Sequence, residues 1–90
     1  MNLRMTKQAL KFIQGLDKKQ SQQVSAAVIA LMSNPNPHDS SALSGAKNGE
    51  KRVDVGEYRV IYTYTPTSVE IIVVGKRNGD EAYKIWKQMQ

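Results

Sequence analysis

The chain has 90 residues, with 13 Lys or Arg against 8 Asp or Glu, which gives a net charge of +5 near neutral pH. We expect one domain over residues 1–90, because a chain of this length divided in two would leave each part too small a core. The lack of cysteine excludes a disulfide scaffold, a thiol nucleophile and a zinc ribbon, and the single histidine, His38, excludes catalysis by paired histidines. No apolar run approaches the ~20 residues that span a bilayer, and residues 1–12 lack the apolar stretch of a signal peptide. We therefore expect a soluble, cytoplasmic protein whose basic surface meets an anionic partner.

The N-terminal half predicts a short edge strand followed by two helices. Residues 1–5 alternate between apolar and polar, as a strand does. Helical spacing follows in two stretches, of which the first ends near Gly15 and the second before Pro35. Asp17 and Gln20 have the spacing of a capping box at the start of the second helix. The two stretches predict an antiparallel helical hairpin, with apolar stripes made by Ala9, Leu10, Ile13 and Leu16 and by Val24, Ala27, Val28 and Leu31.

The C-terminal half predicts a long loop, three strands and a last helix. Residues 34–49 are rich in Pro, Ser, Asn and Gly, which is typical of a loop, and Leu43 would pin this loop to the core. From Lys51 the pattern becomes alternating, with many β-branched and aromatic residues. The fold class is then α+β: the helical hairpin and a C-terminal helix pack on one face of a small antiparallel meander sheet. We predict strands over 52–55, 58–64 and 69–74, turns at 56–57 and 65–68, and a helix over 82–89 with Asn78 or Asp80 as its cap.

The Gly56-Glu57 turn determines which side chains of the first two predicted meander strands share a face. A glycine at the first central position suits a two-residue type II′ turn, so Asp54 would face Arg59 across the hairpin. Alternation then places Arg52, Asp54 and Arg59 together, away from the core. The opposite face, which would pack against the core, is expected to carry Val53, Val55, Tyr58, Val60 and Tyr62. Tyr64 follows the same alternation and is expected to face the core as well.

This polar face has two interpretations. Asp54 and Arg59 could form a cross-strand ion pair worth about 0.2–1 kcal/mol. The arginines could instead hold a phosphate, because a planar guanidinium binds two phosphate oxygens at once. The next strand favours the second interpretation, because it ends at Lys76 and Arg77, beside the start of the last helix. Three of the four arginines in the chain would then converge, and Lys47 and Lys51 would add positive charge.

Two segments of the chain resemble the RelE/ParE toxin superfamily. They are KRVDVGEYRVIY at 51–62 and VVGKR followed by EAY within 73–83, and the order of elements agrees over nearly the whole chain. The likeness is closest to the RelE-type messenger-RNA interferases. The resemblance implies a RelE-like fold and a type II toxin that cleaves mRNA in the A site of a 70S-type ribosome, without cofactor or metal. It also implies inhibition by a cognate antitoxin, for which we expect an acidic or amphipathic segment.

The resemblance also suggests the catalytic residues. Arg59 matches the strand arginine that contacts the scissile phosphate, Arg77 the arginine after the last strand, and Tyr83 the tyrosine of the final helix. Arg52 stands where the family often has a lysine. Together, Arg52 and Arg59 would hold the phosphate charge, Arg77 the leaving oxygen, and Tyr83 a base or the 2′-OH.

The chain departs from the family at Glu50, because this position is commonly basic in the best-known members. The departure leaves the general base open, with Lys51 and Lys47 as possible substitutes, and we expect Lys47, Lys51 and Lys76 to contact RNA. His38 is expected to be a surface residue. Since no strong acid–base pair is present, we expect cleavage only of mRNA that the ribosome aligns.

Two alternatives stay open at this point. One is a ParE-like inhibitor of DNA gyrase without nuclease activity, against which the presence of Arg59, Arg77 and Tyr83 argues. The other is an inactive, toxin-like binding module, which the Glu50 departure allows.

Overall fold

The structure is a computed structural model that describes residues 1–90. Its five strands form one sheet in the order β1-β5-β4-β3-β2. Three helices and a 3-10 turn complete the chain, and no helix is both long enough and apolar enough to cross a membrane. The elements are β1 (Asn2–Met5), α1 (Lys7–Gln14), α2 (Lys18–Ser33), β2 (Ser41–Ala42), β3 (Lys51–Val55), β4 (Tyr58–Thr65), β5 (Ser68–Lys76), the 3-10 turn η1 (Asn78–Asp80) and α3 (Glu81–Gln88).

The sheet is mixed, and the prediction of an antiparallel sheet was wrong at one edge. β1 pairs with β5 in parallel, with Leu3 opposite Val69. The other pairs, β5–β4, β4–β3 and β3–β2, are antiparallel. Parallel pairing needs a crossover, which here is the whole chain from α1 to β4. The sequence pattern of a five-residue edge strand does not reveal a partner so far along the chain.

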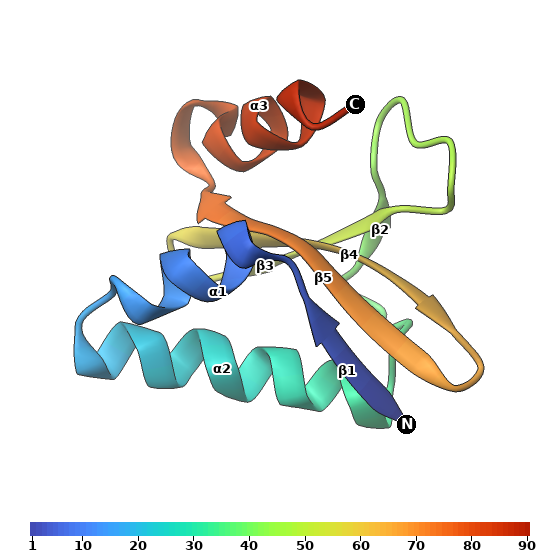
Figure 1. Cartoon of the computed structure of the whole chain (residues 1–90), viewed down its shortest axis with the longest axis horizontal. Helices are drawn as coiled ribbons and strands as arrows, with labels where there is room; N and C mark the ends of the chain where they lie inside the picture. The colour runs from blue at the N-terminus through green and yellow to red at the C-terminus, as the bar shows by residue number, and fades with distance from the viewer.

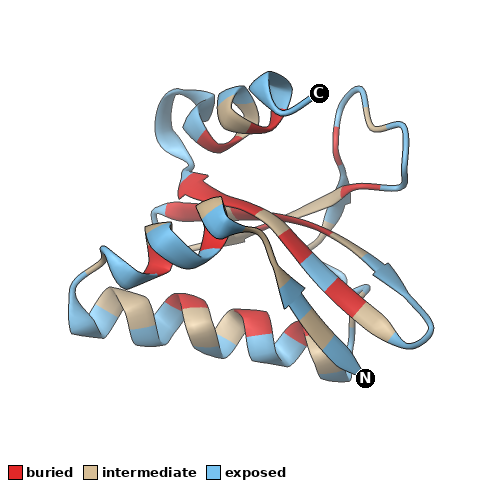
Figure 2. Ribbon diagram, viewed as in Figure 1, coloured by how far each residue is buried: buried red, intermediate tan, exposed pale blue.

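The helices cover both faces of the sheet, which corrects the expectation that all of them share one face. α1 and α2 pack below the sheet in the view of Figure 1, while α3 lies above it. Buried residues therefore form two clusters, one on each side of the strands (Figure 2). The larger cluster joins Ala9, Val24 and Val28 to the strands, and the smaller one contains Leu43 and Trp86. The predicted role of Leu43 in fixing the 34–49 loop is thus confirmed.

The hairpin of β3 and β4 has the predicted register. Asp54 lies opposite Arg59, and Val53 lies opposite Val60. Gly56 has φ +58°, a conformation that glycine adopts without strain in a two-residue turn. Tyr58 is buried among the residues that face α1 and α2, as expected. Arg52, Asp54 and Arg59 consequently share the face on which α3 sits.

A bulge in β5 breaks the alternation beside this hairpin. Ile61 pairs with Val73 while Tyr62 pairs with Ile71, so Ile72 is the extra residue. Ile72 and Val73 both pack in the cluster under α3, whereas Ile71 and Val74 face α1 and α2. This explains why β5 carries a continuous apolar run.

Two smaller expectations need correction. Asp17 caps α2, since its Oδ1 accepts from the Gln20 amide at 2.8 Å, but the Gln20 side chain does not return to close a capping box. It accepts instead from the Tyr58 hydroxyl at 2.8 Å and so ties α2 to the hairpin turn. Tyr64 was expected among the core residues and is 39% exposed, because it lies near the end of β4 beyond the cover of the helices.

Candidate functional site

The first turn of α3 approaches the sheet through Gly75. This residue pairs with Arg59 across β4 and β5, and a Cβ atom there would lie 3.0 Å from the Ala82 Cα. Only a glycine leaves room for the helix at that distance, and Ala82 is fully buried against it. The start of α3 is therefore held directly beside Arg59 and the centre of the polar face.

A pocket of about 340 Å³ opens at this junction. The hydroxyl of Tyr83 donates to the Ser44 carbonyl oxygen at 3.2 Å, which joins α3 to the loop between β2 and β3. Three of the four residues predicted to be catalytic are in the pocket wall. The fourth, Arg77, is not in the wall, but it contacts the same Asp54 carboxylate as Arg59. The wall consists of Leu43, Ser44, Arg52, Arg59, Asp80 and Tyr83.

The carboxylate of Asp54 lies among three arginines. Its Oδ1 accepts from Arg59 Nε at 2.7 Å and its Oδ2 from Arg59 Nη2 at 3.4 Å. Arg52 Nη1 is 4.0 Å from Oδ1, and Arg77 Nη1 is 3.8 Å from Oδ2. The predicted cross-strand ion pair and the predicted convergence of arginines are thus both present. The hydrogen bond from Arg59, and after it the attraction of the three cations, lowers the pKa of Asp54 below 3.8 despite partial burial.

Arg59 is the least exposed of the clustered guanidiniums, with 14% of its side chain accessible, against 35% for Arg52 and 49% for Arg77. Its hydrogen bond to Asp54 raises its pKa further above that of an ordinary arginine, so this cation is permanent. The edge of the guanidinium that Asp54 does not occupy faces the pocket, where Nη1 is 3.6 Å from Asp80 Oδ1.

The position of Asp80 in the pocket was not foreseen, because the sequence suggested only a helix cap. Asp80 does stand at the start of α3, but its side chain makes no capping hydrogen bond. Its backbone is left-handed, with φ +53°, after Gly79 at +67°. This turn swings the carboxylate toward Arg59. The Asn-Gly-Asp sequence signals a tight turn, although nothing in the sequence indicates which way its last side chain points.

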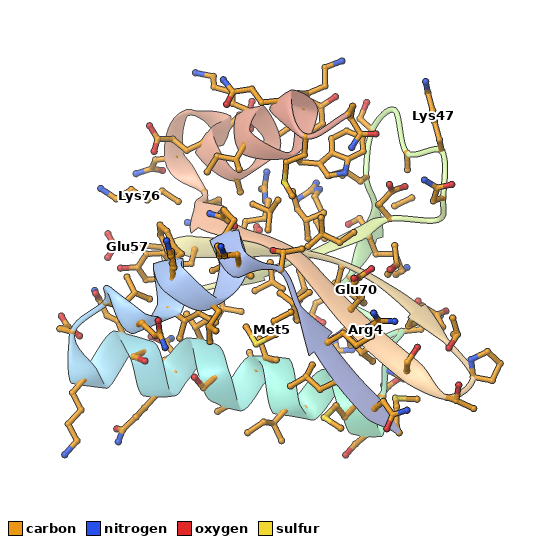
Figure 3. The ribbon with its side chains drawn as sticks, in the orientation of Figure 1. Arg4, Met5, Lys47, Glu57, Glu70 and Lys76 are labelled. Atoms are coloured by element: carbon orange, nitrogen blue, oxygen red, sulfur yellow. The ribbon has the colours of Figure 1, made fainter.

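The lysines do not gather at the pocket. Lys51 alternates with Val53, so it belongs to the face covered by α2 and is separated from Arg52 by the strand itself. Lys76 lines a different, smaller pocket together with Glu57, and the exposed Lys47 points outward from the loop between β2 and β3 (Figure 3). The pocket is therefore an arginine site rather than a general cationic surface.

Glu50 occupies a position that is commonly basic in the toxin family that the sequence resembles. In this structure Glu50 is only 3% exposed. Its Oε1 accepts from the Asn48 amide at 2.8 Å, and its own carbonyl oxygen accepts from the Leu43 amide at 3.0 Å. Glu50 thus shapes the loop that forms one side of the pocket. His38 is exposed, as expected, and the chain has no group of three or more side chains arranged to ligate a metal ion.

Comparisons with known proteins agree with this architecture. A family model described as the ParE toxin of the type II toxin–antitoxin system parDE matches residues 3–81. A chain of the archaeal RelE–RelB complex from Pyrococcus horikoshii OT3 is 25% identical with a TM-score of 0.74, over 87% of this chain and 96% of that one. The isolated E. coli RelE toxin is 21% identical with a TM-score of 0.71, over 99% and 98% of the two chains. Staphylococcus aureus YoeB, solved as a dimer, is 20% identical with a TM-score of 0.68, over 81% and 92%. No match was found among curated protein sequences.

Proposed function

The chain belongs to the RelE/ParE superfamily of toxins from type II toxin–antitoxin systems, and from that premise we propose that it is an endoribonuclease. In this proposal it cleaves mRNA in the A site of the ribosome and so blocks translation. The observation that carries the proposal is the pocket itself, in which Arg52 and Arg59 meet Tyr83. Guanidinium forks match the oxygens of a phosphodiester, and an aromatic ring beside them can stack on a base.

The reaction we propose uses the nucleophile that RNA carries. The 2′-oxygen attacks the adjacent phosphorus while the bond to the 5′-oxygen breaks, which leaves a 2′,3′-cyclic phosphate and a 5′-hydroxyl. The 2′-OH gives up its proton to water and the departing 5′-oxygen takes a proton from water, since the pocket wall holds no imidazole for either transfer. Arg59 and Arg52 stabilise the charge that develops on the non-bridging oxygens, and Arg77 stabilises the leaving oxygen without transferring its own proton, because guanidinium pKa values exceed about 12.

Dependence on the ribosome follows from what the pocket lacks. Its wall contains no imidazole, and its one carboxylate, Asp80, is paired with Arg59 at 3.6 Å. The pKa of the nearby Asp54 is lowered, which makes that carboxylate a weak base. Alignment of the 2′-oxygen with the phosphorus must then supply much of the acceleration, and a ribosome that holds the codon in a bent conformation can provide it. We accordingly assign the chain no rapid activity on free RNA.

An antitoxin is the second partner in the proposal. Similar solved structures include the E. coli RelBE complex and the E. coli DinJ–YafQ complex, each of which is described as a toxin–antitoxin complex. For this chain, an acidic or amphipathic antitoxin segment laid over the pocket would complement the net charge of +5.

Inhibition of DNA gyrase is the competing function, and the description of the matching family model as a ParE toxin favours it. A brief pulse of expression separates the two. Our proposal predicts new RNA ends within translated codons and unchanged plasmid supercoiling. A growth arrest with intact mRNA and lost supercoiling would establish the competing function. A chain that causes no arrest when it is made without antitoxin would be an inactive module.

A further inference from the structure

We propose that Asp54 is a positioning residue for the reaction: it fixes the Arg59 guanidinium so that one edge of it always faces the pocket. This inference rests on the proposed function, because it assumes that Arg59 acts on the scissile phosphate. It assigns a role to a carboxylate that at first sight only neutralises the site.

The geometry separates the two edges of the Arg59 guanidinium. Asp54 accepts from Nε at 2.7 Å and from Nη2 at 3.4 Å, so one side of the planar fork is occupied. Nη1 is on the other side and lies near Asp80, which is part of the pocket wall. Arg59 itself lines the pocket, whereas Asp54 does not. Asp54 therefore holds the guanidinium from behind, and a phosphate that binds the Nη1 edge would displace Asp80 but not Asp54.

The same carboxylate keeps the neighbouring arginines together. Arg52 and Arg77 approach its two oxygens at 4.0 and 3.8 Å, from β3 and from the end of β5. Without a negative charge among them, the three guanidiniums would repel one another and turn toward solvent. The two-residue turn at Gly56-Glu57 fixes Asp54 opposite Arg59, so this charge is placed by the backbone register and not by a mobile loop.

Asp80 provides a charge-matched comparison. It contacts the same guanidinium at Nη1, 3.6 Å away, but it lines the pocket and 73% of its side chain is exposed. It thus stands where a phosphate oxygen would bind. Asp54→Asn and Asp80→Asn each remove one negative charge beside Arg59, so both raise the positive potential of the pocket, Asp80→Asn by less because its carboxylate is more exposed. Only Asp54→Asn also weakens the hold on the rear edge of the fork, because it replaces two charged acceptors with one neutral amide oxygen.

The test is cleavage of ribosome-bound mRNA by the purified chain, with kcat and KM measured for wild type and variants. We expect Asp54→Asn to lower kcat by about tenfold or more with little change in KM, the loss typical of one charge-assisted hydrogen bond. Asp80→Asn should lower KM, because a competing anion is removed, and Glu70→Gln on β5, outside the pocket, should leave both kcat and KM unchanged. Asp54→Glu should recover part of the lost kcat, since it restores a charged acceptor with two oxygens for the fork. A kcat for Asp54→Asn equal to that of the wild type or of Glu70→Gln would overturn the inference.

A spectroscopic readout separates positioning from misfolding. In arginine-labelled protein, the Arg59 Nε–H signal should be shifted downfield and slow to exchange in wild type and Asp80→Asn, and should move upfield and exchange faster in Asp54→Asn. The other amide signals should stay in place. If the wild type shows no cleavage at all, the proposed function itself fails. If the wild type cleaves and Asp54→Asn cleaves equally well, only the positioning role fails.

Discussion

The pKa of Asp54 differs between the folded and the unfolded chain, so the charge of Asp54 contributes to the stability of the fold. In the unfolded chain this carboxylate would titrate near its ordinary pKa of 3.8, whereas in the fold the hydrogen bond from Arg59 lowers the pKa. A carboxylate whose pKa is lowered by folding stabilises the protein above its unfolded pKa, and that contribution disappears as the pH falls through the folded value. The ion pairs of this site therefore stabilise the fold at neutral pH and are lost in acid below about pH 3.8.

We predict that Asp54→Asn lowers the free energy of unfolding by about 1–2 kcal/mol near neutral pH, because it removes a charged hydrogen bond that is partly screened by solvent. The difference between wild type and variant should shrink as the pH falls below 3.8. Urea denaturation followed by circular dichroism at several pH values measures both quantities. A difference that stays constant down to the acid limit of the folded state would show that the charge of Asp54 contributes nothing.

Tyr83 has its hydroxyl committed to the Ser44 carbonyl oxygen at 3.2 Å. The ring is then the part of the side chain that is available to RNA, so we predict that it stacks on a base and does not orient the 2′-OH. Tyr83→Phe should keep cleavage of ribosome-bound mRNA within a few-fold of wild type. Tyr83→Ala should lose about tenfold or more, as expected for one base–aromatic stack of about 1–3 kcal/mol. A Tyr83→Phe variant as inactive as Tyr83→Ala would assign the hydroxyl to the chemistry.

At the scale of elements, the site depends on how closely α3 approaches β5. Ala82 and Trp86 are buried in the cluster under α3, while Tyr83 reaches the pocket from the same helix. The position of α3 over the sheet is set by Gly75, because a side chain there would collide with the helix backbone. A shift of α3 would move Tyr83 and Asp80 away from Arg59 and would open the pocket.

We predict that Gly75→Ala destabilises the protein by about 1–3 kcal/mol, the usual cost of overpacking, and also lowers cleavage. Thermal unfolding and cleavage of ribosome-bound mRNA measure the two effects. Gly15→Ala is the control, since Gly15 ends α1 with φ −83° and a Cβ atom there would lie no closer than 3.5 Å to any neighbour. Its effect should stay within about 0.5 kcal/mol. Equal stability of the two variants would contradict the close approach of α3.

At the scale of the whole molecule, local patterns in the sequence predicted what lies close along the chain. The register of β3 and β4 follows from the Gly56-Glu57 turn and from alternation, so the shared face of Arg52, Asp54 and Arg59 was predictable. The same alternation also implied that Lys51 points to the opposite face, although the likeness to the toxin family had suggested it as a site residue.

Three features were not predictable, because each depends on contacts that no local pattern encodes. The parallel pairing of β1 with β5 joins distant parts of the chain. An apolar stripe on α3 shows that the helix is buried, but not which sheet face it covers. Asp80 points into the pocket because its backbone is left-handed, and this conformation is set by the packing of α3 on the sheet and not by the local sequence.

The opposite edge of the sheet supplies a control for the site. Arg4 lies exposed on β1, opposite Glu70 of β5, and at the far edge of the sheet from β3 (Figure 3). It carries the same charge as Arg59 but takes no part in the pocket. Comparing the two arginines therefore separates the chemistry of the pocket from the general effect of positive charge on binding to RNA.

The most direct test of the arginine pocket is the single-turnover rate at which excess toxin cleaves mRNA held in the ribosomal A site. Arg59→Ala should cut at least about a hundredfold more slowly than wild type, because a fixed charge at the developing phosphorane is lost. Arg4→Ala should cut within a few-fold of wild type at the same salt concentration. If Arg59→Ala and Arg4→Ala cleave at the same rate, the pocket does not stabilise the reacting phosphate and the account is wrong.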